Sequence, residues 1–130
     1  MVLVVDDERS VRTLAQRVLE RAGFRVLTAA DGVEAVESVR QHEAAISIVL
    51  LDLMMPRLGG EQAMKAMRQV VPALPVVFMS GYSDDSVAEW VRALENVDFL
   101  PKPYSNVQLI TTISALLGRS ASDRKPQPAV

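Results

Sequence analysis

Five polar side chains follow directly after short apolar runs, at positions where a β-strand would end. They are Asp6, Asp7, Asp52, Ser80 and Lys102. Because ligands of an open parallel sheet bind beyond the carboxyl ends of its strands, these side chains are expected to converge at one edge of a sheet. The sequence therefore predicts a site built from carboxylates, a hydroxyl and an ammonium group.

Carboxylates at short distance repel one another strongly, so they must share protons or bind a cation. Oxygen ligands without histidine or cysteine favour a hard divalent ion, and Mg²⁺ (or Mn²⁺) suits an open rim of acids. A metal ion and Lys102 beside Asp52 would neutralise a phosphoryl group on that carboxylate, and Ser80 would donate a hydrogen bond to it. The set therefore indicates aspartyl-phosphate chemistry with Asp52 as the nucleophile.

Each of these residues also has a simpler interpretation. An isolated acid such as Asp6 or Asp7 can cap the following helix, and Ser80 can be another cap. Asp52 can be a turn residue, and Lys102 can be a solvated surface charge. Their placement on successive predicted strand ends favours the functional interpretation. Lys102 also lies inside the apolar stretch of residues 99–104, which a surface charge would not require.

The elements that would position these side chains alternate along the chain. Apolar runs predict β-strands over residues 2–5, 25–29, 46–51, 75–79 and 97–100. Apolar residues at helical spacing predict helices over residues 10–22, 33–40, 60–70, 84–94 and 105–117. This alternation predicts an α/β fold, a doubly wound five-stranded parallel sheet with helices on both faces.

Capping signals mark several ends of these helices. Ser10 is expected to cap the first helix, and Gly23 stands where the residue after a helix end favours glycine. Ser83 or Asp84 is expected to cap the fourth helix, and Gly118 to close the last one.

Length and composition fit a single globular domain. The chain has 130 residues, of which 49% are hydrophobic and 23% charged, with a net charge of -2. This balance excludes a generally basic nucleic-acid binder. We expect residues 1–118 to form the domain and residues 119–130, which include two prolines, to be a flexible tail.

Several site classes are excluded by residues that the chain lacks. It has no cysteine and one histidine, His42, so neither a disulfide framework nor a thiolate or His-cluster metal site is expected. No apolar run approaches the about 18 residues of a membrane-spanning helix, and no charged-then-apolar leader opens the chain. The expected location is cytoplasmic.

Four segments together resemble the receiver domain of two-component response regulators (CheY-like). They are Val2–Glu8, Leu50–Pro56, Met79–Tyr82 and Leu100–Pro103, in this order and at these spacings. The similarity covers residues 2 to 117, nearly the whole chain. The resemblance implies a flavodoxin-like sheet with strand order 2-1-3-4-5.

The resemblance also implies roles for individual residues. Asp52 would be the phosphoacceptor and Asp7 a direct Mg²⁺ ligand, while Asp6 would hold the metal's waters. The backbone carbonyl of Met54 would complete the protein ligands. Lys102 would pair with the phosphoryl group.

Further residues would act in the conformational switch of such a domain. The resemblance implies that Ser80 is the switch hydroxyl, Phe99 the switch aromatic, and the Lys102–Pro103 bond cis. Gly60 would occupy the family's glycine position in the loop after the phosphoacceptor. Serine stands where threonine is frequent, and phenylalanine where tyrosine is frequent, so the switch ring lacks a hydroxyl.

The implied partners are proteins. A histidine kinase or histidine phosphotransfer domain would supply the phosphoryl group. A downstream protein would bind the fourth helix, fifth strand and last helix, where Trp90 either points outward or is packed. No helix-turn-helix or basic segment follows residue 117, so direct nucleic-acid binding is not expected, nor is membrane contact by this domain.

The motif pattern is similar to receivers of hybrid sensor kinases, and Met1 stands directly before the first predicted strand. Both favour a receiver from a longer kinase, with a stand-alone regulator as the alternative.

An aspartyl-phosphate phosphatase is disfavoured because Met54 stands where such enzymes need a second acid. A flavodoxin is disfavoured because Asp6, Asp7 and Glu8 would repel the flavin phosphate. A degenerate receiver that only binds partners is disfavoured by the intact acidic set.

Overall fold

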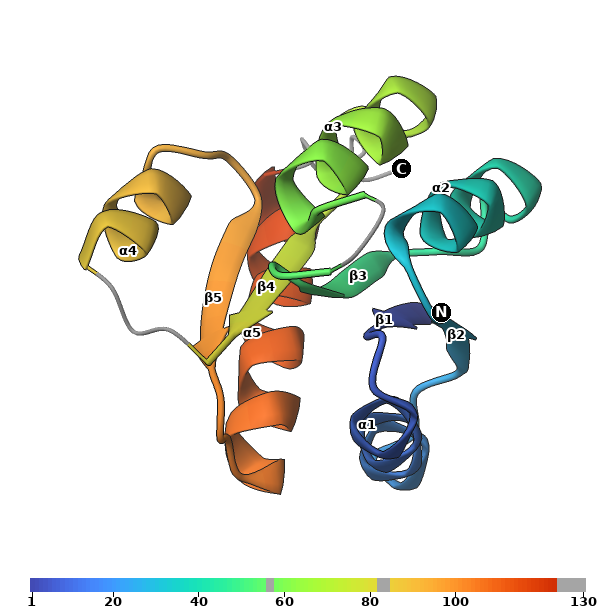
Figure 1. Cartoon of the computed structure of the whole chain (residues 1–130), viewed down its shortest axis with the longest axis vertical. Helices are drawn as coiled ribbons and strands as arrows, with labels where there is room; N and C mark the ends of the chain where they lie inside the picture. The colour runs from blue at the N-terminus through green and yellow to red at the C-terminus, as the bar shows by residue number, and fades with distance from the viewer. Residues whose placement is uncertain (56–57, 82–84, 124–130) are drawn as a thin grey trace, which may run out of the picture.

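The computed structural model describes residues 1–55, 58–81 and 85–123. Strands and helices alternate along this part of the chain, as Figure 1 shows. The strands are β1 (Val2–Val5), β2 (Val26–Ala29), β3 (Ile48–Asp52), β4 (Val76–Ser80) and β5 (Val97–Pro101). The helices are α1 (Arg9–Arg21), α2 (Gly32–Gln41), α3 (Gly60–Val70), α4 (Asp85–Arg92) and α5 (Asn106–Asp123).

The strands form one parallel sheet with the order β2-β1-β3-β4-β5, which confirms the predicted fold class and strand order. The register aligns the carboxyl ends of the inner strands. Val5 pairs with Leu51, and Asp52 pairs with Met79. Side chains that follow β1, β3, β4 and β5 therefore reach the same edge of the sheet.

Helices cover both faces of the sheet because alternate strand residues point to opposite sides. One core cluster joins strand side chains such as Leu3 and Phe78 to α2, α3 and α4. The other joins strand side chains such as Val4 and Leu50 to α1 and α5. In Figure 1, α1 accordingly lies on the opposite side of the sheet from α2 and α3. The inner strands β1, β3 and β4 are buried from both sides, which explains why they are nearly continuous apolar runs.

The end of α1 agrees with the sequence, but its start does not. Gly23 has φ +98°, the left-handed conformation expected of a glycine after a helix end. Ser10 does not cap the helix, since α1 begins at Arg9 and Glu8 occupies the N-cap position. The reason is local: the Asp6 carboxylate accepts a hydrogen bond from the Glu8 N–H at 2.9 Å, which starts the helix earlier.

The expected end of the last helix at Gly118 is wrong. Helix α5 continues through Gly118 to Asp123, so residues 119–123 are helical. Gly118 is not among the described residues with positive φ, and a glycine without that conformation can remain within a helix. Residues 124–130 of the expected tail lie outside the described residues, so the flexibility of that segment stays a prediction.

Two further predicted boundaries concern the start of the third strand and the caps of the fourth helix. The third strand begins at Ile48 rather than at residue 46, because the Ile46 N–H donates to the His42 carbonyl in the turn after α2. The expected caps of the fourth helix, Ser83 and Asp84, lie outside the described residues. Among the described helices, none has both the length and the apolar character needed to cross a membrane.

Candidate functional site

The two buried aspartates of the site make the same local contact with the backbone. Asp6 follows β1 and is 1% exposed, and Asp52 ends β3 and is 6% exposed. Asp6 Oδ1 accepts the Glu8 N–H at 2.9 Å, and Asp52 Oδ1 accepts the Met54 N–H at 3.0 Å. Each aspartate therefore forms an Asx turn that fixes one carboxylate oxygen and leaves the other directed into the site.

Lys102 joins these two remaining oxygens. Its Nζ donates to Asp6 Oδ2 at 2.8 Å and to Asp52 Oδ2 at 3.3 Å. The segment that carries it is tied to the neighbouring strand, since the Lys102 N–H donates to the Ser80 carbonyl at 2.8 Å. The Lys102–Pro103 peptide bond is cis, as the resemblance implied.

The third aspartate, Asp7, is exposed and lies beside the other two. Asp6, Asp7 and Asp52 each offer a carboxylate oxygen, and these oxygens all lie within 4.8 Å of one another. An oxygen-only donor set with one solvent-facing member fits a hard divalent cation that retains waters. The three aspartates that the sequence predicted as metal-binding residues are therefore together in space.

Burial and charge pull the ionisation of this cluster in opposite directions. Burial raises the pKa of the Asp52 carboxyl above its ordinary value, although the Met54 N–H and the charge of Lys102 act against this rise. Burial alone would lower the pKa of Lys102, but its hydrogen bond to Asp6 and the charges of Asp52 and Asp6 together raise it. Lys102 is consequently a fixed cation between two carboxylates.

The expected switch residues lie on β4, which pairs with the strand of Asp52, and on β5, the strand beyond it. Ser80 is the last residue of β4 and is 2% exposed. Phe99 is half-buried on β5 and packs against the cluster that also contacts α4. Trp90 of α4 is packed rather than fully outward, because its ring lies 5.2 Å from that of the buried Phe78, centroid to centroid.

Gly60 occupies a position with no room for a side chain. A Cβ at this residue would lie 2.7 Å from the Asp52 carbonyl oxygen and 2.8 Å from the Leu53 Cα. The Gly60 N–H donates to the Leu53 carbonyl at 3.1 Å. The first turn of α3 is therefore packed directly against the backbone of Asp52 and Leu53.

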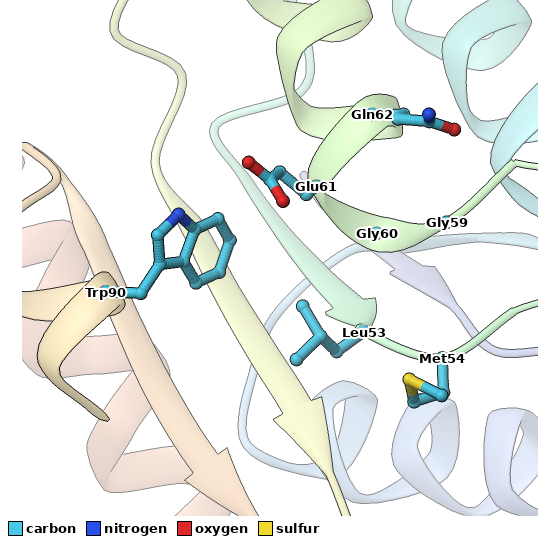
Figure 2. A pocket seen from close by; sticks show the side chains of 7 residues that line it. All are labelled: Leu53, Met54, Gly59, Gly60, Glu61, Gln62 and Trp90. Atoms are coloured by element: carbon cyan, nitrogen blue, oxygen red, sulfur yellow. The ribbon is translucent and has the colours of Figure 1, made fainter. Parts of the chain in front are cut away.

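A pocket of about 480 Å³ lies next to this turn (Figure 2). Its walls are Leu53 and Met54 after β3, the first turn of α3, and the indole of Trp90. Met54 is 62% exposed at its mouth. Because the Met54 N–H donates to the Asp52 carboxylate, this pocket connects the loop after Asp52 with α4.

Arg12 was missed by the sequence-based interpretation. Its guanidinium donates to the backbone carbonyl of Asp6 at 2.7 Å. The signal that could have found it is its place in the first turns of the helix that follows Asp6 and Asp7. A backbone acceptor leaves no trace in the sequence, however, so the contact itself was not predictable.

Comparison with known proteins agrees with this geometry. Residues 2–114 match the family model of the response regulator receiver domain. The chain is 38% identical over 116 residues to the sensor kinase CckA of Brucella abortus, an alignment that covers 89% of this chain and 12% of the kinase. It is 38% identical over 127 residues to the response regulator MprA of Mycobacterium sp. (strain KMS), covering 96% of this chain and 54% of that protein.

Solved structures give the same result. The receiver domain of the hybrid histidine kinase CckA is 34% identical, with a TM-score of 0.76 and coverage of 89% of this chain and 97% of that one. The Vibrio cholerae chemotaxis protein CheY4 is 28% identical, with a TM-score of 0.79 and coverage of 88% and 96%.

These matches define the class of protein as a phosphoacceptor module of two-component signal transduction. The chain belongs to the response regulator receiver domain family. It spans about half, or much less, of the length of the curated relatives it matches.

Proposed function

We propose that Asp52 accepts a phosphoryl group from the phosphohistidine of a histidine kinase or histidine phosphotransfer domain, in a Mg²⁺-dependent reaction. The observation that carries this proposal is the position of the Asp52 carboxylate. It ends β3 next to Lys102 and within 4.8 Å of oxygens from Asp6 and Asp7. A nucleophilic carboxylate with this surrounding charge suits phosphoryl transfer.

The chain's own residues would prepare the reaction. The Met54 N–H holds Asp52 Oδ1, so the direction of the carboxylate is set before the phosphodonor arrives. A carboxylate oxygen of Asp52 would form a bond to phosphorus while the phosphorus–nitrogen bond to the histidine breaks. The imidazole would leave with the electron pair and take a proton from solvent. Lys102 would then pair with a phosphoryl oxygen.

The metal ligands in this proposal are Asp7 and Asp52, the backbone carbonyl of Met54, and Asp6 through coordinated water. The oxygen-only character of the acid set supports this assignment. When bound, Mg²⁺ supplies positive charge against the phosphoryl oxygens.

The output would be a change of surface. Ser80 would move toward the phosphoryl group and Phe99 would shift on β5, which alters the surface of α4, β5 and α5 that a downstream protein binds. The packing of Phe99 and Trp90 against the same core cluster supports this route, since it connects β5 with α4.

Acetyl phosphate with Mg²⁺ tests the proposal by mass spectrometry of the intact protein. One phosphoryl group is expected on the wild type and none on Asp52→Asn, and chelation of the metal should abolish labelling. Asp98→Asn is the matched control, because Asp98 lies on β5 and pairs with Arg119 at 2.8 Å, outside the site. Equal labelling of the wild type and Asp52→Asn would remove Asp52 from this role.

Two parent proteins fit this role. Similarity to the sensor kinase CckA supports the hybrid-kinase context, whereas similarity to the response regulator MprA supports a separate regulator. Of the two, we propose that this receiver is part of a hybrid sensor kinase. The complete reading frame around this chain distinguishes the two, since a kinase domain in it would support the first.

A further inference from the structure

We propose that Arg12 is a positioning residue that holds the Asp6–Glu8 turn in its metal-binding geometry. This inference rests on the proposed Mg²⁺-dependent function of the same site. Arg12 is half-buried in α1, and its Nη1 donates to the Asp6 carbonyl at 2.7 Å. Arg12 therefore contacts the backbone of a metal-binding residue rather than the metal position itself.

The residues on both sides of Asp7 are held in place. The Arg12 guanidinium binds the Asp6 carbonyl at 2.7 Å, while Glu8 is held by the first backbone hydrogen bond of α1, from the N–H of residue 12 at 3.0 Å, which does not depend on the arginine side chain. Asp7 lies between these two anchored residues. Because its own side chain is exposed, the direction of the Asp7 carboxylate depends on the backbone that Arg12 fixes.

The contact completes the restraint of Asp6. Its N–H donates to the Ala29 carbonyl at 3.3 Å, its Oδ1 accepts from Glu8 and its Oδ2 accepts from Lys102. The Asp6 carbonyl is the remaining polar group, and Arg12 occupies it. Without Arg12 the peptide between Asp6 and Asp7 would lose the charged donor that sets its orientation.

The positive charge of Arg12 repels a nearby cation, and this repulsion opposes the gain in metal affinity from the positioned turn. If repulsion dominated, removing Arg12 would strengthen Mg²⁺ binding. We expect positioning to dominate, since the charge acts next to water, where such effects are weak, while loss of residues that orient metal ligands typically weakens affinity by about 10- to 100-fold. The sign of the change in affinity therefore decides between the two roles.

Isothermal titration of MgCl₂ into the unphosphorylated protein measures this sign. Arg12→Ala is expected to weaken Mg²⁺ affinity about tenfold. Arg12→Lys keeps the charge but lacks the planar guanidinium, so it is expected to weaken affinity as well, to a smaller extent. Arg17→Ala is the matched control: Arg17 is an exposed arginine of the same helix, and its replacement should change the affinity less than about twofold.

Two results would overturn the proposal. One is Mg²⁺ affinity in Arg12→Ala equal to or tighter than that of the wild type. If circular dichroism shows that Arg12→Ala does not fold, the Arg12→Lys variant decides instead. The second overturning result is then a Mg²⁺ affinity of Arg12→Lys equal to that of the wild type. At saturating Mg²⁺ the final extent of labelling by acetyl phosphate should recover, because the defect lies in metal affinity.

The same data separate this proposal from the proposed function. A wild type that binds Mg²⁺ but is not labelled on Asp52 contradicts phosphoacceptance by that residue and leaves the positioning role standing. A wild type that is labelled, with unchanged Mg²⁺ affinity in the Arg12 variants, contradicts only the positioning role.

Discussion

The Lys102 ammonium lies 2.8 Å from Asp6 Oδ2, and this ion pair joins residues 96 positions apart in the sequence. The Asp6 side chain is 1% exposed and that of Lys102 23% exposed. The longer contact of Lys102, 3.3 Å, is to the proposed phosphoacceptor Asp52. Lys102 is thus held mainly by Asp6, which is not the proposed nucleophile. The charge of Lys102 should therefore stay in place when the groups bound to Asp52 change on phosphorylation.

Removing the Lys102 charge should destabilise the protein. Lys102→Met leaves Asp6 and Asp52 facing each other without their cation. Breaking a buried pair costs about 3–5 kcal/mol, and the partial exposure of Lys102 reduces this to about 2–3 kcal/mol at neutral pH. Urea denaturation measures the loss, and added Mg²⁺ should restore part of it.

Lys65→Met is the control for that substitution. Lys65 pairs with Glu61 at 3.3 Å, but its side chain is 69% exposed, so the change should be less than about 0.5 kcal/mol. Equal destabilisation by both substitutions would contradict a special role for the Lys102 ion pair.

Asp52→Asn should stabilise the metal-free protein in a pH-dependent way. Burial raises the pKa of Asp52 in the folded state above the ordinary 3.8, so the folded state holds this proton more tightly than the unfolded state. Ionisation of Asp52 therefore lowers stability as the pH rises from about 4 through the folded pKa. At neutral pH the free energy of unfolding of Asp52→Asn should therefore exceed that of the wild type by about 1 kcal/mol, a common size for a stabilising substitution at a functional site.

The measurement is denaturation of both proteins in a chelator at several pH values. The gain from Asp52→Asn should shrink as the pH falls toward 4 and also when Mg²⁺ is added to the wild type. A stability difference between Asp52→Asn and the wild type that is independent of pH would contradict the assigned cause.

The sequence allowed the strand ends and the convergence of the site to be predicted, because a doubly covered parallel sheet needs continuous apolar strands that stop at polar residues. Helix ends were less predictable. A serine such as Ser10 is a good cap, but the Asp6 contact to the Glu8 N–H determines where α1 begins. A glycine such as Gly118 often ends a helix, yet it also fits within one when its φ is negative.

Within the site, the predictable part was the set of charged side chains. Apart from the pairs with Lys102, the contacts that orient these side chains were not predictable, because they are made to backbone atoms. The Met54 N–H and the Asp6 carbonyl are present whatever the side chain at those positions, so the roles of Arg12 and of the two Asx turns emerge only from the folded chain.

Gly60→Ala should disturb the loop that carries the phosphoacceptor. The added Cβ would lie 2.7 Å from the Asp52 carbonyl oxygen and 2.8 Å from the Leu53 Cα, and backbone atoms have little freedom to move away. We expect a loss of about 1–3 kcal/mol in stability and slower labelling of Asp52 by acetyl phosphate.

Gly59→Ala is the matched control, because a Cβ at Gly59 has no atom within 4 Å. This neighbouring substitution should leave labelling unchanged. Slower labelling in Gly59→Ala, or normal labelling in Gly60→Ala, would contradict the close packing of α3 on the phosphoacceptor loop.

Trp90 should report phosphorylation by its fluorescence. It is the single tryptophan of the chain, it packs on Phe78, and it lines the pocket that Met54 and Leu53 share (Figure 2). A change at Asp52 is transmitted to Met54 through their hydrogen bond, so the environment of the indole should change when the phosphoryl group is added. Emission should shift with acetyl phosphate and Mg²⁺ in the wild type but not in Asp52→Asn. Trp90→Phe should lose the signal while still being labelled, and an unchanged wild-type spectrum at full labelling would show that α4 does not respond to the phosphoacceptor.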